Sequence, residues 1–231
     1  MNQLPLAVGF DQEPEFDDYV AGANGEAVAV LAAWVDGGDE PFLYVFGPSG
    51  TGKSHLLLAA CRRGAAQSAR VAYLPLADRQ LVPDALEGLE HADLVALDDL
   101  QAVAGDRAWE LAIFNLYNRL RENGRRLVAS ANAPPAELPL DLPDLRSRLG
   151  WGPGYRLQPL GDSDCERLLV RSAERRGLRL GEDLRSYIMR RCRRDPRSLI
   201  RLLERLDEAS LSRKRRPTLT LVRELLRAPT P

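Results

Sequence analysis

Residues 47 to 54 have the types and the order of a phosphate-binding loop. The segment reads Gly47-Pro48-Ser49-Gly50-Thr51-Gly52-Lys53-Ser54 and satisfies the pattern G-x-x-x-x-G-K-[ST]. Glycines let backbone N–H groups close around phosphate oxygens, and a following helix adds its positive N-terminal end. We expect Lys53 to bridge the outer phosphates of ADP or ATP and Ser54 to ligate Mg²⁺. The alternative is a glycine-rich turn without a ligand. Only two of the 32 basic residues are lysines, so a lysine at position 53 indicates that a compact ammonium group is needed there.

Two aspartates and an asparagine come directly after apolar runs. Asp98 and Asp99 follow the run 94–97, and Asn132 lies two residues past the run 127–130. In nucleotide-binding sites a strand often delivers a carboxylate towards the bound metal, and we expect Asp98 to take this position next to Mg²⁺. Asp99 would then polarise the attacking water, and Asn132 would orient the same water through its amide. The alternatives are a solvated pair of turn aspartates and an ordinary turn asparagine.

The elements that must position these residues form an alternating series. Short apolar runs, each ending at turn or polar residues, lie at 42–46, 71–74, 94–97 and 127–129. Helical patterns lie at 26–34, with Asn24 as the expected cap, and at 54–63 and 109–122. This alternation predicts an α/β fold of the P-loop NTPase class, a parallel sheet flanked by helices.

The character of the chain changes near Gly161. Strand signals vanish after Tyr155, and three or four amphipathic helices follow. The charge changes at about the same point: residues 1–164 hold 13 basic and 24 acidic residues, and residues 165–231 hold 19 and 9. We expect a flexible arm at 1–15, a nucleotide-binding core at 16–160 and a small helical lid domain at 161–231. The basic lid is consistent with nucleic-acid binding or with a solvated helical face.

Several classes of protein are excluded by composition. The sequence of 231 residues contains no run of eighteen apolar residues, and its N-terminus has neither a basic flank nor a long apolar stretch, which argues against membrane spanning and secretion. Three cysteines and two histidines at wide spacing make no zinc pattern. We therefore expect a cytoplasmic protein with reduced thiols and no membrane partner.

The order of these motifs resembles that of the AAA+ module of the bacterial replication initiator family DnaA. The phosphate-binding loop, Asp98-Asp99 and Asn132 are followed by Arg-Ser-Arg-Leu-Gly-Trp-Gly at 146–152 and by Asp-Pro-Arg-Ser-Leu at 195–199. Residues 16–24 also resemble that module's first segment, which borders the adenine pocket in the family. The resemblance spans about residues 16 to 227.

The resemblance implies roles for two arginines. Arg148 would be an arginine finger that reaches the nucleotide of a neighbouring subunit, and Arg197, at the start of the third lid helix, would sense the bound nucleotide. A structural alternative for Arg148 is an ion pair with Asp144 or Glu137. AAA+ proteins usually carry Glu where this chain has Asp99, so its own ATPase activity is expected to be weak.

The Hda branch of this family is the closer match. The sequence ends at Pro231, where DnaA continues into a helix-turn-helix domain, and Gln3-Leu4-Pro5-Leu6 resembles the peptide by which Hda binds the DNA polymerase sliding clamp. Gln3, Leu4 and Leu6 would then be pocket anchors, and DNA would be reached only through the clamp, at the nucleoid. The alternative is an apolar tail without a partner.

The expected function is negative regulation of chromosomal replication initiation. On this interpretation, a clamp-bound protein presents Arg148 to ATP held by DnaA and promotes its hydrolysis. The alternatives are a self-sufficient AAA+ ATPase that remodels or loads a replication protein, and a DNA-binding module that acts through the basic lid. The sequence leaves open whether ADP or ATP is the active ligand and whether the resting form is a homodimer.

Overall fold

The chain folds into two compact units. The computed structural model describes residues 14–192, 195–213 and 217–227. The first unit ends at Gln158 and the second begins at Pro159. The second unit was expected to begin at residue 161, so the observed boundary lies two residues earlier in the chain.

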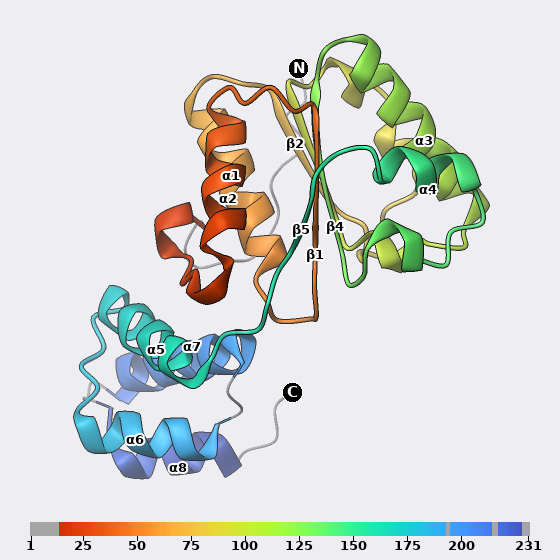
Figure 1. Cartoon of the computed structure of the whole chain (residues 1–231). Helices are drawn as coiled ribbons and strands as arrows, with labels where there is room; N and C mark the ends of the chain where they lie inside the picture. The colour runs from red at the N-terminus through yellow and green to blue at the C-terminus, as the bar shows by residue number, and fades with distance from the viewer. Residues whose placement is uncertain (1–13, 193–194, 214–216, 228–231) are drawn as a thin grey trace. The chain divides into compact units, whose positions relative to one another are not determined.

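A five-stranded parallel sheet forms the centre of the first unit (Figure 1). Its strands are β1 Phe42–Phe46, β2 Val71–Pro75, β3 Leu94–Asp98, β4 Arg126–Ala131 and β5 Gly154–Arg156, in the order β2-β3-β4-β1-β5. The first four coincide with the predicted apolar runs. The strand β5 was not predicted, because this edge strand has only three residues and reads Gly-Tyr-Arg, without an apolar run.

Helices cover both faces of this sheet. They are α1 Gly25–Val35, α2 Lys53–Ala66, α3 Arg107–Glu122 and α4 Pro143–Leu149. Figure 1 shows α1 and α2 on one face and α3 and α4 on the other. Short 3-10 helices complete the described connections: η1 Phe16–Asp18, η2 Gly22–Asn24, η3 Pro83–Leu86, η4 Leu89–His91, η5 Leu100–Ala102 and η6 Pro135–Glu137.

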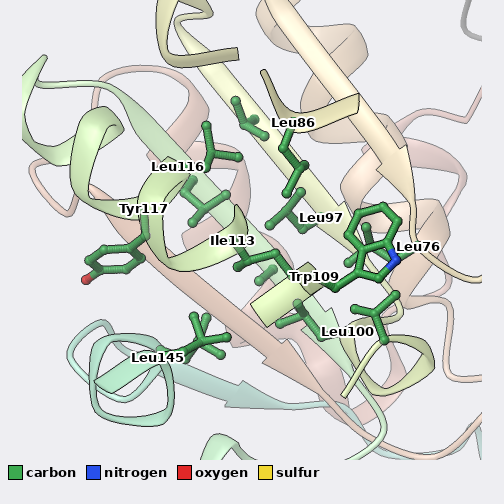
Figure 2. Close-up of a cluster of buried hydrophobic side chains, with 14 of the residues drawn as sticks. Leu76, Leu86, Leu97, Leu100, Trp109, Ile113, Leu116, Tyr117 and Leu145 are labelled. Carbon is green, nitrogen blue, oxygen red and sulfur yellow. The ribbon is translucent and has the colours of Figure 1, made fainter. Parts of the chain in front are cut away.

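The strands are apolar on both faces because each face has its own core. Along β1, Leu43 and Val45 pack towards α1 and α2, whereas Phe42 and Tyr44 pack towards α3 and α4. The second of these cores appears in Figure 2, where Trp109, Ile113 and Leu116 of α3 lie around Leu97 of β3. This two-sided burial explains why the runs lack the alternation of a half-exposed sheet.

The described residues of the second unit form four helices around a separate leucine-rich core. The helices are α5 Asp162–Arg175, α6 Glu182–Arg191, α7 Pro196–Arg213 and α8 Leu219–Arg227. Cys165, Leu169, Ile188, Leu199 and Leu203 are fully buried between them. None of the helices in the described parts of the chain has the length and apolarity that a membrane span requires.

The predicted fold class is confirmed: a helix-flanked parallel sheet is followed by a small helical domain. Because all five strands are parallel, their carboxyl ends meet at one edge of the sheet. Ligands of open α/β sheets bind outside this edge.

Candidate functional site

Three of the predicted motifs meet at the carboxyl edge of the sheet. In the strand order, β4 lies between β1 and β3. The phosphate-binding loop 47–54 follows β1, Asp98 is the last residue of β3, and Asn132 comes directly after β4. The backbone N–H of Gly47 donates to the carbonyl of Ala131 at 3.2 Å, which ties the loop to the end of β4.

The backbone of the loop depends on its glycines. Gly50 and Gly52 have φ of +83° and +86°, in the left-handed region that glycine favours. A Cβ on Gly52 would also lie 2.5 Å from Cε2 of Tyr19, so the loop and this ring pack too closely for any side chain there. The helix α2 begins at Lys53, and its N-terminal end therefore faces the loop.

The ammonium group of Lys53 points into the loop. Its Nζ donates to the carbonyls of Gly47 at 2.8 Å and Pro48 at 3.1 Å, and the residue is 7% exposed. Burial lowers the pKa of Lys53, and the charges of Asp99 and Asp98 oppose this shift. A cation held by loop carbonyls beside a helix N-terminus fits a phosphate group that would take over these contacts.

Tyr19 and Asn24 support the loop from the N-terminal segment. The Tyr19 hydroxyl donates to the carbonyl of Thr51 at 2.7 Å and accepts from Nδ2 of Asn24 at 3.1 Å. Burial raises the pKa of Tyr19 to about 12, so the hydroxyl stays protonated and can donate. Oδ1 of Asn24 accepts from the backbone N–H of Gln158 at 2.7 Å, and Nδ2 donates to the Gln158 carbonyl at 3.0 Å.

The cap expected from Asn24 is absent. Asn24 occupies the N-cap position of α1, but its side chain makes no capping hydrogen bond within the described residues and joins the N-terminal segment to Gln158 instead. The contact spans 134 positions in the sequence, which no local pattern can indicate.

Asp98 is buried and held by two hydroxyl groups. Its Oδ2 accepts from the Tyr73 hydroxyl at 2.7 Å, and its Oδ1 accepts from Oγ of Ser130. The residue is 2% exposed, so Asp98 is not the solvated turn aspartate of the alternative interpretation. The buried ring and the neighbouring carboxylate of Asp98 raise the pKa of Tyr73, which keeps the phenol a hydrogen-bond donor.

Asp99 lies at a turn that is strained for a residue with a side chain. Its φ is +60°, and its backbone N–H donates to Oγ of Ser130 at 3.0 Å. Gln101 connects Asp99 to the end of β4: its Nε2 donates to Oδ1 of Asp99 at 2.8 Å, and its Oε1 accepts from the backbone N–H of Asn132 at 3.0 Å. Strained non-glycine residues cluster at functional sites.

The residues at this edge fit a magnesium nucleotide. Within the described parts of the chain, no group of three histidine, cysteine or acidic side chains could hold a metal by itself. Mg²⁺ in nucleotide sites is usually held by one or two protein ligands, phosphates and water. Ser54, in the first turn of α2, and Asp98 are the two candidate ligands. Because each oxygen of Asp98 already accepts a hydrogen bond, contact through a metal-bound water suits it better than direct ligation.

Arg148 belongs to the last turn of α4 and makes no hydrogen bond to the described residues of this network. Its ζ carbon is 4.0 Å from the centroid of the Trp151 ring. The ion pairs within the described residues do not include Arg148, so the expected alternative, a pair with Asp144 or Glu137, is not observed. Trp151 itself is 55% exposed.

Two further predicted positions lie elsewhere. Arg197 is exposed in the second unit, in the first turn of α7, where Asp195 accepts from the backbone N–H of Ser198 at 2.9 Å. Gln3, Leu4 and Leu6, the expected clamp peptide, lie outside the described residues.

No functional position was predicted for Tyr73, Gln101 or Ser130, and Tyr19 was included only as part of the segment 16–24 that resembles the border of the adenine pocket. Of these, Ser130 carried a readable signal, because a polar residue ended an otherwise apolar run next to the predicted site. Tyr73 and Gln101 carried no such signal, and neither did the contact of Tyr19 with the phosphate-binding loop, since these contacts join separate elements.

Each of the two units matches a known family model. The family model of the bacterial DnaA ATPase domain matches residues 10–154, and the model of the Hda lid domain matches residues 162–226. Domain III of the Thermotoga maritima replication initiation protein DnaA is similar over 95% of this chain and 98% of its own, with a TM-score of 0.83 and 20% identity.

More distant structures share the fold. AMPPCP-bound DnaA from Aquifex aeolicus is similar over 90% of this chain and 70% of its own, with a TM-score of 0.72 and 21% identity. A mutant of Thermotoga maritima RuvB covers 93% of this chain and 72% of its own, with a TM-score of 0.65 and 19% identity. The DnaA model alone spans more than half of the sequence, and the resemblance expected from the motifs is confirmed. The chain belongs to the bacterial DnaA ATPase-domain family, as an Hda-type, DnaA-homologous AAA+ protein.

Proposed function

We propose that this protein is an Hda-type negative regulator of replication initiation that promotes the hydrolysis of ATP bound to DnaA. Arg148 acts as the arginine finger, and residues Gln3, Leu4 and Leu6 tether the protein to the sliding clamp. The observation that carries the proposal is the state of Arg148: a guanidinium at the end of α4 that pairs with no carboxylate among the described residues and stacks on an exposed tryptophan. Its charge is therefore available to a partner.

The chemistry takes place on the partner's nucleotide. Negative charge spreads over the transferred phosphoryl group in the transition state, and a guanidinium placed against it accelerates hydrolysis by about 10³ to 10⁵ in well-studied systems. Such a contact lowers the barrier most when the arginine is held in place beforehand, because ordering a long side chain at the moment of reaction costs free energy. The stack on Trp151 supplies part of this order.

The protein's own nucleotide site serves to bind ADP or ATP with Mg²⁺. Lys53 would contact the outer phosphates, Ser54 would ligate the metal, and Asp98 would contact the metal through a bound water. The ion would neutralise phosphate charge. Arg197 of the lid is proposed to sense the nucleotide, so that occupancy sets the state of the protein. Asp99 is held by Gln101 through its Oδ1, which supports slow turnover at this site.

The test is single-turnover hydrolysis of labelled ATP on DnaA, with clamp loaded on DNA. Arg148→Ala is expected to lower the rate by about a hundredfold or more while ADP affinity, melting temperature and clamp binding stay unchanged. Arg107→Ala, which removes an exposed arginine at the start of α3, is the matched control and keeps the wild-type rate. A wild-type rate with Arg148→Ala refutes the finger.

The clamp tether is tested in the same assay. Replacing Gln3, Leu4 and Leu6 by alanine is expected to remove the clamp dependence of hydrolysis and binding to immobilised clamp, because an extended peptide relies on a few side-chain anchors. If the triple variant binds clamp at wild-type affinity, the N-terminal peptide is not the tether.

A self-sufficient ATPase is the second candidate. The observation in its favour is that Lys53, Asp98, Asp99 and Asn132 gather at one edge of the sheet, which is the arrangement that hydrolysis within one subunit requires. Steady-state ATP hydrolysis by the purified protein separates the two functions: a rate near the 1–100 s⁻¹ scale typical of phosphoryl-transfer enzymes such as kinases supports this candidate. Turnover that requires DnaA supports the first.

A further inference from the structure

Two arginines share the ring of Trp151. The ζ carbon of Arg148 lies 4.0 Å from the ring centroid, and that of Arg121 lies 4.9 Å from the same centroid. Arg121 belongs to the last turn of α3, so cations from two helices meet on a ring that neither helix contains. Trp151 is the exposed tryptophan of the chain, at 55%, whereas Trp34 and Trp109 are 2% and 7% exposed.

Neither arginine has an acidic partner among the described residues. The ion pairs observed there involve neither Arg121 nor Arg148. The neighbouring arginine of α3, Arg119, does have one, since its guanidinium lies 3.7 Å from the Glu90 carboxylate. Two positive charges that lie against one ring repel each other, and a bound anion relieves that repulsion. The pair is the more unusual because residues 1–164 carry almost twice as many acidic as basic residues.

A hydroxyl group next to this pair reports the same electrostatics. Tyr117 is 1% exposed, and its buried hydroxyl oxygen has no hydrogen-bond partner among the residues that the structure describes. In Figure 2 that oxygen points away from the leucine side chains around Leu97 and Ile113. Burial raises the pKa of Tyr117, and the positive charges of Arg121 and Arg148 act against this shift. Both arginines therefore lie within electrostatic reach of one buried group.

The backbone that carries the ring and the finger is fixed. A Cβ on Gly152 would lie 2.3 Å from the carbonyl oxygen of Phe42, so the residue after Trp151 is in direct contact with β1. At the other end of α4, the buried carboxylate of Glu110 accepts from the backbone N–H groups of Asp141 at 3.0 Å and Leu142 at 2.6 Å. A site held at both ends loses little entropy when a ligand binds.

We propose that Arg121, Trp151 and Arg148 form one anion-binding platform, which receives the triphosphate of the nucleotide held by a partner AAA+ subunit. Arg121 is a second cation that contacts the phosphates, and Trp151 is a positioning residue for both guanidinium groups. Stacking on a ring leaves the N–H edge of a guanidinium available for phosphate oxygens. This inference rests on the proposed function, because it takes the partner's ATP as the ligand.

The experiment is the single-turnover assay on DnaA-bound ATP, with the concentration of this protein varied so that the maximal rate and the half-saturating concentration are measured separately. Arg121→Gln is expected to lower the maximal rate about tenfold with less than about a twofold change in half-saturation, since the contact is made to reacting phosphates. Arg119→Gln, on the same helix, is the matched control and keeps both values.

Trp151 is tested by a pair of substitutions. Trp151→Leu is expected to lower the maximal rate about tenfold, and Trp151→Phe, which keeps an aromatic face, is expected to restore it to within about threefold of wild type. A wild-type maximal rate with Arg121→Gln overturns the platform. So does a change confined to half-saturation, which would make Arg121 a docking contact rather than a phosphate contact.

A second measurement keeps the inference separate from the proposed function. With Mg²⁺-ADP saturating the protein's own site, sodium tripolyphosphate is titrated while tryptophan fluorescence is recorded. A saturable change is expected in the wild type, weakened at least about fivefold in Arg121→Gln and lost in Trp151→Phe. If hydrolysis on DnaA is insensitive to Arg148→Ala, the proposed function fails, and this titration still decides the platform. Absence of a saturable change overturns it.

Discussion

Lys53 and Arg148 are both cations without a carboxylate partner among the described residues, but their surroundings give them different tasks. The ammonium of Lys53 is buried and held by carbonyls of its own loop. The guanidinium of Arg148 lies against an exposed ring. A compact ammonium suits the first position because it moves between carbonyls and phosphate oxygens, and a planar guanidinium suits the second because it can stack and donate at once.

Lys53→Ala is expected to lower ADP affinity by at least about a hundredfold, because the variant lacks the charge that neutralises the outer phosphates. Isothermal titration calorimetry measures the affinity, and thermal unfolding without nucleotide establishes that the variant is folded. Arg63→Ala, which removes an exposed ion pair with Asp36 further along α2, should leave the affinity unchanged. Unchanged ADP affinity in folded Lys53→Ala would refute the assignment of the loop.

At the scale of elements, α4 depends on tertiary contacts for its place and its existence. A helix of seven residues is not stable by itself in water. Leu145 and Leu149 are buried on one side of it, and Glu110 of α3 binds the backbone just before and at its start. Glu110 also accepts from the backbone N–H of Gly105 at 2.8 Å, so one carboxylate fixes three N–H groups. Arg148, the proposed finger, therefore lies on a helix whose start is fixed by a residue 38 places earlier in the chain than Arg148.

Glu110→Gln is expected to lower the free energy of unfolding by about 2–4 kcal/mol, because the amide oxygen can replace Oε1 but the amide NH2 group then faces the N–H of Leu142 and leaves that buried donor without an acceptor. Urea unfolding of the two proteins measures the difference. Glu122→Gln, an exposed position on the same helix, is the control and should change stability by less than about 0.5 kcal/mol. Equal effects of the two substitutions would show that the carboxylate does not anchor α4.

The whole molecule divides its chemistry between two units of opposite charge. The acidic first unit contains the carboxyl edge of the sheet. It also contains a cysteine thiol and several tyrosine hydroxyl groups that burial keeps protonated in the folded protein. Burial raises the pKa of Cys61 from 9.0 to about 12 and that of Tyr19 to about 12, and it also raises the pKa values of Tyr44 and Tyr73. Since the unfolded chain releases these protons at lower pH than the folded chain, alkali favours unfolding.

The free energy of unfolding is therefore expected to fall as the pH rises through about 9, where the thiol of an unfolded chain is half ionised. From pH 8 to pH 10.5, Cys61 alone should account for a loss of about 2 kcal/mol, since one pKa unit corresponds to about 1.4 kcal/mol. Urea unfolding at both pH values, in the wild type and in Cys61→Ala, measures this share as the difference between the two losses. Equal losses in both proteins would contradict a raised Cys61 pKa.

The sequence by itself determined the features that depend on neighbouring residues. The phosphate-binding loop was readable because the glycines and Lys53 lie within eight residues, and four strands were readable because a strand buried on both faces is a continuous apolar run. The order of motifs also sufficed for the family, which the DnaA and Hda lid matches confirm. The clamp peptide remains a prediction, because its residues lie outside those described.

The tertiary structure decided the contacts between elements that lie far apart in the sequence. Because β4 lies between β1 and β3, Ser130 forms hydrogen bonds with the Asp98 carboxylate and with the backbone N–H of Asp99. The same strand order lets Gln101 form hydrogen bonds with both Asp99 and Asn132. Arg121 reaches Trp151 across 30 positions in the same way. Local periodicity reports which face of an element is buried and says nothing of which element covers it, so these contacts exist only once the sheet has its order and the helices have packed onto it.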